Sequence, residues 1–194
     1  MSEQSHSDEP GFSIRPATTQ DVEAIAAIYA GYVKTSIVTL EEQEPSTATM
    51  LSRFQSITAT GHPYIVATAA VASTTSPSSP SGETIAGYAF TSPFNERTGY
   101  RYSVSTSVYL HPDFLRQGLG MTLMRELLAQ VKAKGFRQVL AGMSVGVGQA
   151  VEEVPSCKMH GRLGFEVVAR LKGVGEKFGK VVDVVWMQAE VGNL

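Results

Sequence analysis

The chain of 194 residues is 43% hydrophobic and 18% charged, which is typical of a soluble globular domain long enough to bury a core. Its formal net charge of −2 argues against a nucleic acid as the main partner, because nucleic-acid binders usually carry a basic excess. No apolar run approaches the roughly 18–20 residues that cross a bilayer, and the polar N-terminus lacks the apolar segment of a signal peptide.

The domain organisation that we expect is simple. Residues 1–11 are predicted to form a disordered tail, residues 12–190 a single domain, and residues 73–83 a flexible loop, because that stretch is low in complexity and rich in serine and proline. The one cysteine, Cys157, excludes an intrachain disulfide and fits a reducing compartment, so we expect a cytoplasmic protein.

Periodicity predicts the elements in chain order. Alternating or β-branched runs predict strands, and apolar residues at helical spacing predict helices. Strands are expected at residues 12–15, 64–71, 85–91, 100–110, 138–145, 165–171 and 181–188. Helices are expected at residues 22–32, 48–57, 121–134 and 156–163, and residues 173–179 are expected to form a connecting loop. The order β-α-α-β-β-β-α-β-α-β-β predicts an α/β domain with a mixed sheet.

The strand at residues 100–110 has an unusual polar centre, which contains Ser103, Ser105, Thr106 and Ser107. An exposed strand face and a polar cleft explain this pattern equally well.

A glycine-punctuated turn follows that strand, which Pro112 ends, and precedes the helix that closes at Gly135. Free backbone N–H groups at the start of a helix favour an anion such as a phosphate. The missing β-carbons of Gly118 and Gly120 would let a pyrophosphate approach the backbone. A tight turn without a ligand is the alternative. A dinucleotide motif is excluded because Leu123 occupies its third glycine position, and the Gly-Lys-Ser/Thr of nucleotide hydrolases is absent.

These residues also resemble a known family. Val108-Tyr-Leu-His-Pro112 followed by Arg116-Gln-Gly-Leu-Gly120 is similar to the pyrophosphate-binding motif Gln/Arg-x-x-Gly-x-Gly/Ala of the GNAT superfamily of N-acetyltransferases. Leu115 occupies the first position of the motif, where the family has Gln or Arg, and Arg116 stands beside it. Met159-His-Gly-Arg-Leu-Gly-Phe165 and Val174-Gly-Glu-Lys-Phe-Gly-Lys-Val-Val-Asp183 resemble the phosphinothricin and methionine sulfoximine N-acetyltransferase branch. The resemblance spans residues 14–188.

The resemblance implies a fold and a cofactor. The fold is a mixed, mostly antiparallel twisted sheet flanked by helices, with a splayed central strand pair that admits acetyl-CoA. No metal is implied. The residues implied to bind acetyl-CoA are Val108, Tyr109, Leu110, Arg116, Gln117, Gly118, Leu119, Gly120, Met121 and Ser156.

The resemblance also implies catalytic residues, with departures. The branch uses a glutamate to deprotonate the amine, and Ser105 stands at that place, so either a water relayed by Ser105 or another carboxylate must act. Glu41, Glu42 and Glu44 are candidates, although a solvated acidic loop explains them as well. His160 matches the family histidine and is either catalytic, on the cofactor side, or a structural hydrogen bonder. Glu153 stands where the family has a cofactor-binding asparagine.

Positions carried over from the family predict the acceptor site, in which an arginine would hold a carboxylate. The residues are Arg97, Thr98, Gly99, Tyr100, Arg101, Thr106, Ser107 and Lys177. The activity implied is direct acetyl transfer, in a ternary complex, to the primary amine of a small amino-acid-like molecule by a homodimer, with no nucleic-acid or membrane partner. The alternatives are an acetyltransferase for a polyamine, peptide N-terminus or aminoglycoside, and a catalytically silent acyl-CoA-binding module.

Overall fold

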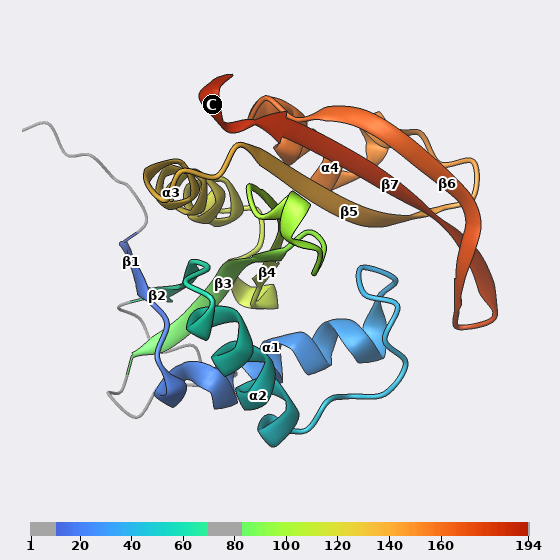
Figure 1. Cartoon of the computed structure of the whole chain (residues 1–194). Helices are drawn as coiled ribbons and strands as arrows, with labels where there is room; N and C mark the ends of the chain where they lie inside the picture. The colour runs from blue at the N-terminus through green and yellow to red at the C-terminus, as the bar shows by residue number, and fades with distance from the viewer. Residues whose placement is uncertain (1–10, 70–82, 194) are drawn as a thin grey trace, which may run out of the picture.

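The computed structural model describes residues 11–69 and 83–193, which form one sheet with helices on both faces (Figure 1). The predicted tail lies almost wholly outside the described residues, as does the predicted flexible loop. The strands are β1 (Phe12–Pro16), β2 (Tyr64–Ala69), β3 (Thr84–Pro93), β4 (Ser103–Leu110), β5 (Gln138–Gly146), β6 (Glu166–Lys177) and β7 (Lys180–Glu190). The helices are α1 (Val22–Thr35), α2 (Thr47–Ala59), α3 (Leu119–Ala133) and α4 (Pro155–Arg162).

The sheet has the strand order β1-β2-β3-β4-β5-β7-β6. Every neighbouring pair is antiparallel except β4 and β5, which run parallel. The prediction of a mixed, mostly antiparallel sheet is therefore confirmed. Among the helices of the described residues, none is long and apolar enough to span a membrane.

The central strand pair separates after a short stretch of pairing. β4 and β5 are paired over three residue pairs, from Ser103 opposite Gln138 to Ser105 opposite Leu140. Beyond them β4 stays paired with β3 up to Leu110, and β5 stays paired with β7 up to Gly146. The predicted splay is thus present, and beyond Ser105 it leaves one edge of β4 without a neighbouring strand among the described residues.

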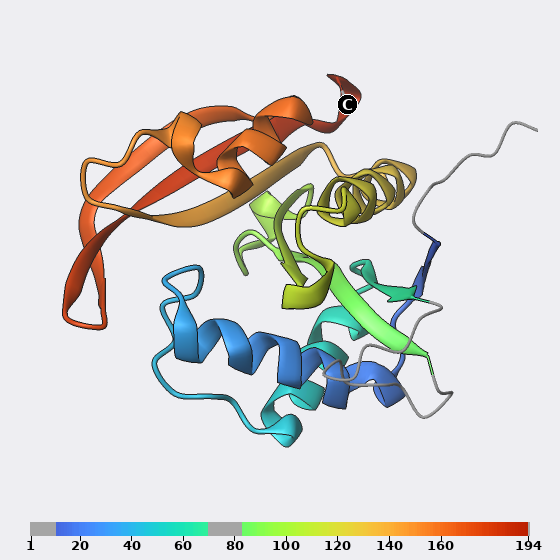
Figure 2. The same cartoon turned by 180° about the vertical axis from the view of Figure 1, so that it is seen from behind.

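Two hydrophobic cores cover the two faces of the sheet. α1 and α2 pack on one face around Ile25, Phe54 and Tyr88, and α3 and α4 pack on the other around Leu123 and Met124. Figure 2 shows the same two layers from behind. Because side chains alternate along a strand, each residue of β4 belongs to one face only.

Several element boundaries differ from the predictions, two of them beside β4. The predicted strand at residues 100–110 begins only at Ser103, because Thr98–Tyr100 form a 3₁₀ turn. β3 continues through Ser92 to Pro93, where a loop was expected.

The glycine-rich segment at residues 173–179 is mostly strand, which corrects the predicted loop. Only Phe178 and Gly179 form the turn, with φ of 54° and 68°, as a tight type I′ hairpin requires. The Asp183 carboxylate accepts hydrogen bonds from the Gly173 N–H and from Arg170 Nε, both at 2.8 Å, where the pairing of β6 and β7 is irregular. The hairpin is therefore much longer than expected.

The end of this hairpin contacts the loop between α1 and α2, as Figure 1 shows at the end farthest from the C-terminus. Lys177 is 1% exposed, and its Nζ donates to the Thr39 carbonyl at 2.8 Å. A β-carbon on Gly175 would lie 2.5 Å from Leu40 Cδ1, so the glycine permits this close packing. The contact joins the two halves of the sheet across the splay.

Candidate functional site

The turn before α3 presents backbone N–H groups that have no acceptor within the described residues. Gly118 has a φ of 80° and Arg116 a φ of 61°, so the backbone turns through two left-handed residues just before the helix. The N–H of Met121 bonds back to the Gly118 carbonyl at 3.0 Å, whereas the N–H groups of residues 118–120 are free. Such a turn at a helix N-terminus favours binding of an anion.

Glycine is favoured at positions 118 and 120 for different structural reasons. A β-carbon on Gly118 would meet nothing within 4 Å, although its positive φ would strain any other residue. A β-carbon on Gly120 would lie 3.2 Å from Met159 Sδ and 3.4 Å from Leu110 Cδ1. Gly118 thus faces open space in front of the turn. The missing β-carbon of Gly120 accommodates packing of α3 against α4 and β4, and a role of Gly120 in cofactor binding stays a prediction.

The free edge of β4 also carries unpaired backbone groups. The N–H of His111, directly after β4, donates to the Ala86 carbonyl of β3 at 2.9 Å. Hydrogen-bonding direction alternates along an antiparallel strand, so Tyr109 also bonds to β3 while Val108 and Leu110 face away from it. The N–H and C=O groups of Val108 and Leu110 therefore point into the gap between β4 and β5.

A tyrosine from α1 satisfies part of this edge. The Tyr32 hydroxyl donates to the Leu110 carbonyl at 2.9 Å and accepts from the Leu110 N–H at 3.3 Å. Burial raises the pKa of Tyr32, which keeps the hydroxyl protonated. Val108 remains the residue whose backbone is open to an extended ligand arm in the gap.

α4 places His160 and Ser156 on the same side of the sheet as α3. His160 is 4% exposed, and its Nδ1 lies 2.8 Å from the Ser156 carbonyl, so this nitrogen carries a proton and donates it. Burial lowers the pKa of His160, and the ring also packs edge-on against Phe165. These contacts favour the structural role, and the catalytic role of His160 stays a prediction, as does cofactor binding by Ser156.

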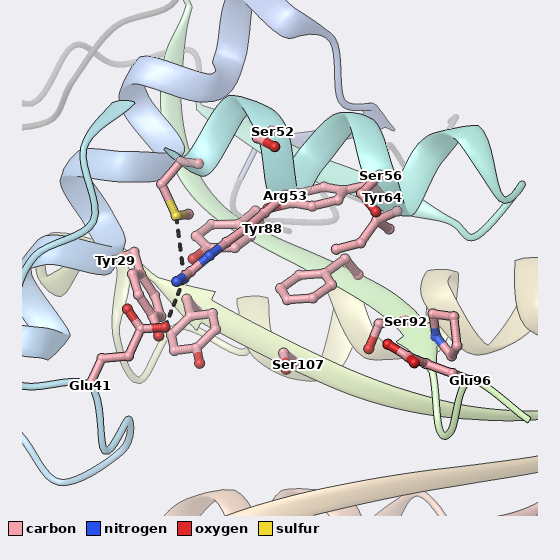
Figure 3. Close-up of a pocket in the computed structure, with 15 residues that line it drawn as sticks. Tyr29, Glu41, Ser52, Arg53, Ser56, Tyr64, Tyr88, Ser92, Glu96 and Ser107 are labelled. Atoms are coloured by element: carbon pink, nitrogen blue, oxygen red, sulfur yellow. Dashed lines mark hydrogen bonds and ion pairs between the residues drawn. The ribbon is translucent and has the colours of Figure 1, made fainter. Parts of the chain in front are cut away.

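A cavity of about 700 Å³ lies on the opposite face, between α1, α2 and the strands β3 and β4 (Figure 3). Five aromatic rings line it, and hydroxyl groups from α2 and the strands add polar atoms. The aromatic residues are Tyr29, Tyr64, Tyr88, Phe90 and Tyr109; the hydroxyl-bearing residues are Ser52, Ser56, Ser92 and Ser107. Because Ser107 and Tyr109 flank Val108, the cavity adjoins the open edge of β4.

Three charged side chains line this cavity. Arg53 Nη1 binds Glu41 Oε1 at 2.8 Å, and this hydrogen bond raises the pKa of Arg53, which stays cationic. Glu96, from the loop between β3 and β4, has no ion pair within the described part of the chain. In Figure 3 Glu96 lies beside Ser92 at one end of the cavity, and the Glu41–Arg53 pair lies at the other.

One buried hydroxyl in the cavity wall is unsatisfied. Tyr88 Oη has no hydrogen-bond partner among the described residues, and the side chain is fully buried. Burial raises the pKa of Tyr88 well above its ordinary value, so the hydroxyl is a neutral donor. An unpaired buried hydroxyl costs free energy, which is typical of a group that serves a ligand.

Of the predicted acceptor-binding residues, only Ser107 lines the cavity. The Thr106 side chain lies on the other face of β4, with Oγ1 3.8 Å from Met124 Sδ of α3. Lys177 Nζ is already bound to Thr39.

The predicted residues 97–101 form an exposed turn outside the cavity lining, where the Arg101 guanidinium lies over the Tyr102 ring. These contacts leave the prediction of acceptor binding by Arg97, Thr98, Gly99, Tyr100 and Arg101 without support from the cavity.

Arg53 and Glu96 were not among the residues predicted from the sequence, whereas Glu41 was a candidate and does line the cavity. A signal for Arg53 existed, since Met50, Arg53 and Ile57 recur at helical spacing and a cation in such a stripe is unusual. No comparable signal marks Glu96, because only the path of the loop turns it toward the cavity.

Comparison with known proteins agrees with this architecture. A family model described as an acetyltransferase (GNAT) domain matches residues 14–186. The phosphinothricin N-acetyltransferase of Alcaligenes faecalis is 33% identical over 176 residues, which are 91% of this chain and 81% of that protein. The L-methionine sulfoximine/L-methionine sulfone acetyltransferase of Pseudomonas paraeruginosa is 31% identical, covering 91% of this chain and 92% of that protein.

A solved structure shares the fold over the same span. The crystal structure of a GNAT superfamily phosphinothricin acetyltransferase from Sinorhizobium meliloti, in complex with acetyl-CoA, has a TM-score of 0.79 and 35% sequence identity. The match covers 92% of this chain and 88% of that chain. Together with the family model, the splayed β4–β5 pair and the turn before α3, this similarity establishes that the chain belongs to the GNAT family of acetyltransferases.

Proposed function

We propose that the protein transfers the acetyl group of acetyl-CoA to the primary amine of a small amino-acid-like molecule, by direct attack in a ternary complex. The observation that carries this proposal is the set of free N–H groups at residues 118–120, beside the open edge of β4. The donor and the acceptor would meet next to Val108.

The donor half of the site fits acetyl-CoA. The free N–H groups and the exposed Arg116 suit its pyrophosphate, and Val108 offers one N–H and one C=O to the amide-bearing pantetheine arm. When bound, acetyl-CoA supplies an activated acetyl group. The chain's own contribution is to grip the phosphates, align the arm along β4 and hold the acceptor on the other side of that strand.

The acceptor half of the site suits a zwitterion with an apolar part. The Arg53 guanidinium has N–H donors beyond Nη1 for a carboxylate, Glu96 favours an ammonium group, and the aromatic rings favour an apolar stem. The similar proteins from Alcaligenes, Pseudomonas and Sinorhizobium are named for phosphinothricin and methionine sulfoximine, both of which are amino acids. These names support amino-acid-like acceptors for this chain.

The test is release of free CoA thiol in the presence of a panel of amines. We expect turnover with phosphinothricin, methionine sulfoximine or related amino acids, and much weaker turnover with polyamines, an aminoglycoside or a peptide N-terminus. Binding of acetyl-CoA without turnover of any amine from pH 7 to 10 would instead favour a silent binding module. Accumulation of acetylated enzyme without an acceptor would contradict direct transfer.

We also propose that the enzyme works as a homodimer in the cytoplasm, without a nucleic-acid or membrane partner. Support for the dimer comes from β6, which is an edge strand with half-exposed Val168 and Val174, 52% and 56% exposed. Exposed apolar side chains on an edge strand favour association with another chain. Light scattering should give twice the chain mass, and Val168→Lys should shift it toward the monomer. A monomeric wild type would contradict the proposal.

A further inference from the structure

Among the described residues, the cavity proposed for the acceptor contains one carboxylate that no cation neutralises, that of Glu96. An amine is mostly an ammonium ion at pH 7, because its pKa is about 8 or higher, and it cannot attack until a proton is removed. The cavity holds two carboxylates, of Glu41 and Glu96. Glu41 is engaged by Arg53 at 2.8 Å, whereas Glu96 has no cationic partner among the described residues.

The strand register brings Glu96 to the level of Ser105. Ser92 of β3 lies directly opposite Ser105 of β4, and such facing residues have β-carbons about 4.5–5.5 Å apart. The chain leaves β3 at Pro93, and Figure 3 shows the Glu96 carboxylate beside Ser92. The carboxylate therefore lies across the strand pair from Ser105, on the face of β4 that also carries Ser107.

The loop that carries Glu96 has a defined shape. Asn95 Oδ1 accepts a hydrogen bond from the Arg97 N–H at 3.0 Å, and the Phe94 N–H bonds to the Ser103 carbonyl at 3.2 Å. These bonds fix the residues on both sides of Glu96. Its position over the end of β3 is thus set by the backbone and does not depend on the carboxylate itself.

We propose that Glu96 is the general base of the reaction and replaces, from the neighbouring strand, the carboxylate that Ser105 cannot supply. The inference rests on the acetyltransferase function proposed above. The ammonium N–H bond breaks, and its proton passes to the Glu96 carboxylate. The freed nitrogen lone pair forms the bond to the acyl carbon while the carbon–sulfur bond breaks and the sulfur keeps that electron pair. The nitrogen then loses a second proton to solvent and becomes a neutral amide, the thiolate sulfur takes up a proton from solvent, and Glu96 releases its proton to solvent.

Glu96→Gln is the test variant, because it keeps the size of the side chain and removes its basicity. We expect kcat/KM for the amine to fall about 100-fold or more at pH 7, the usual range for a general base. The loss should shrink toward pH 9–10, where the amine deprotonates without help. The affinity for acetyl-CoA should stay within about twofold, whereas the affinity of the CoA-bound enzyme for the acceptor, measured by calorimetry at pH 7, should fall at least about fivefold.

Two other variants serve as controls. Glu44→Gln should leave turnover unchanged, because Glu44 lies outside the cavity lining and pairs with Lys34 at 2.9 Å. The double variant Glu96→Gln with Ser105→Glu should be at least about tenfold more active than Glu96→Gln alone, since Ser105→Glu returns a carboxylate to the same place. Failure of that rescue would contradict the proposed location of the base.

The outcomes separate this inference from the proposed function. If the wild type acetylates no amine, the proposed function is refuted and the inference falls with it. If the wild type is active and Glu96→Gln retains more than about a third of its activity at pH 7, or loses the same factor at every pH, only the inference is refuted. A pH-dependent loss in Glu41→Gln instead of Glu96→Gln would identify Glu41 as the base.

Discussion

The same substitution should have a marked effect at Gly118 and little effect at Gly120, the two glycines of the turn. Gly118 has a φ of 80°, and the left-handed conformation costs a residue with a β-carbon about 1–2 kcal/mol. In Gly118→Ala the protein either bears this cost or relaxes the turn and redirects its N–H groups. Each N–H bond to a charged phosphate contributes about 1.5–3 kcal/mol, so losing one of them should raise the Kd for acetyl-CoA about 10- to 100-fold.

Gly120→Ala provides the matched comparison. Its new methyl group would lie 3.2 Å from Met159 Sδ, and a thioether on a flexible side chain can move by the few tenths of an ångström that are needed. Alanine is also more favourable than glycine within a helix by about 0.5–1 kcal/mol. The two effects offset each other, so both stability and acetyl-CoA affinity should stay close to the wild-type values.

Isothermal calorimetry with acetyl-CoA and thermal unfolding check both variants. For a chain of this length, a change of 1 kcal/mol shifts Tm by about 2–4 °C, so the cost in Gly118→Ala is measurable if the turn stays rigid. Wild-type affinity together with a wild-type Tm in Gly118→Ala, or a large loss of affinity in Gly120→Ala with the fold intact, would refute the assignment of residues 118–120 as the phosphate site.

Three further predictions concern the acceptor cavity and the fold. Arg53→Met should raise KM for an amino-acid acceptor about tenfold or more while the Kd for acetyl-CoA stays unchanged; an unaltered KM would remove Arg53 from the acceptor site. Tyr88→Phe should leave the free energy of unfolding unchanged or raise it by up to about 1 kcal/mol, because the hydroxyl is buried without a partner; clear destabilisation in urea would reveal a hidden partner. Burial alone would raise the pKa of Asp21, but hydrogen bonds from Arg15 and Thr18 outweigh it and lower the pKa. The contribution of Asp21 to the free energy of unfolding is therefore present above about pH 4 and is lost as the pH falls through the lowered pKa. Asp21→Asn should thus destabilise the protein at pH 7, and its free energy of unfolding should converge with that of the wild type near pH 2. Measurement of stability across an acid titration will check this.

The turn before α3 could be predicted from the sequence because its determinants are local. A β-branched strand, the Pro112 stop, two glycines and an amphipathic helix follow one another within one stretch of chain. The free N–H groups of residues 118–120 follow from that order, since the first N–H groups of any helix lack intrahelical acceptors. The packing role of Gly120 could not be predicted, because its neighbour Met159 comes from a helix that lies far along the chain.

The cavity proposed for the acceptor was harder to predict because it is assembled from distant segments. Arg53, Glu41 and Glu96 come from a helix, a loop and the end of a strand pair, and only tertiary packing brings them together. Alternation along β4 could have separated Thr106 from Ser107, since neighbouring residues of a strand face opposite sides. Assigning both Thr106 and Ser107 to the acceptor site combined residues that the sheet keeps apart.

The hairpin of β6 and β7 shows how a glycine-rich pattern can mislead. The glycines at positions 173, 175 and 179 indicated a loop, but each has a separate structural task. Gly175 makes room for Leu40, Gly179 forms the turn, and the Gly173 N–H is held by Asp183. Composition alone cannot distinguish a flexible loop from a strand with irregular pairing.

The contact between Lys177 and Thr39 affects how the two reactants can reach the gap between β4 and β5. β4 and β5 are paired at one end of the gap between them, and at the other end the β6–β7 hairpin contacts the α1–α2 loop through Lys177 and Thr39. In the proposed arrangement the nucleotide lies on the α3 side of the sheet and the amine on the α1–α2 side. The two reactants would therefore reach the gap from opposite faces of the sheet, so that the binding of one does not require prior release of the other.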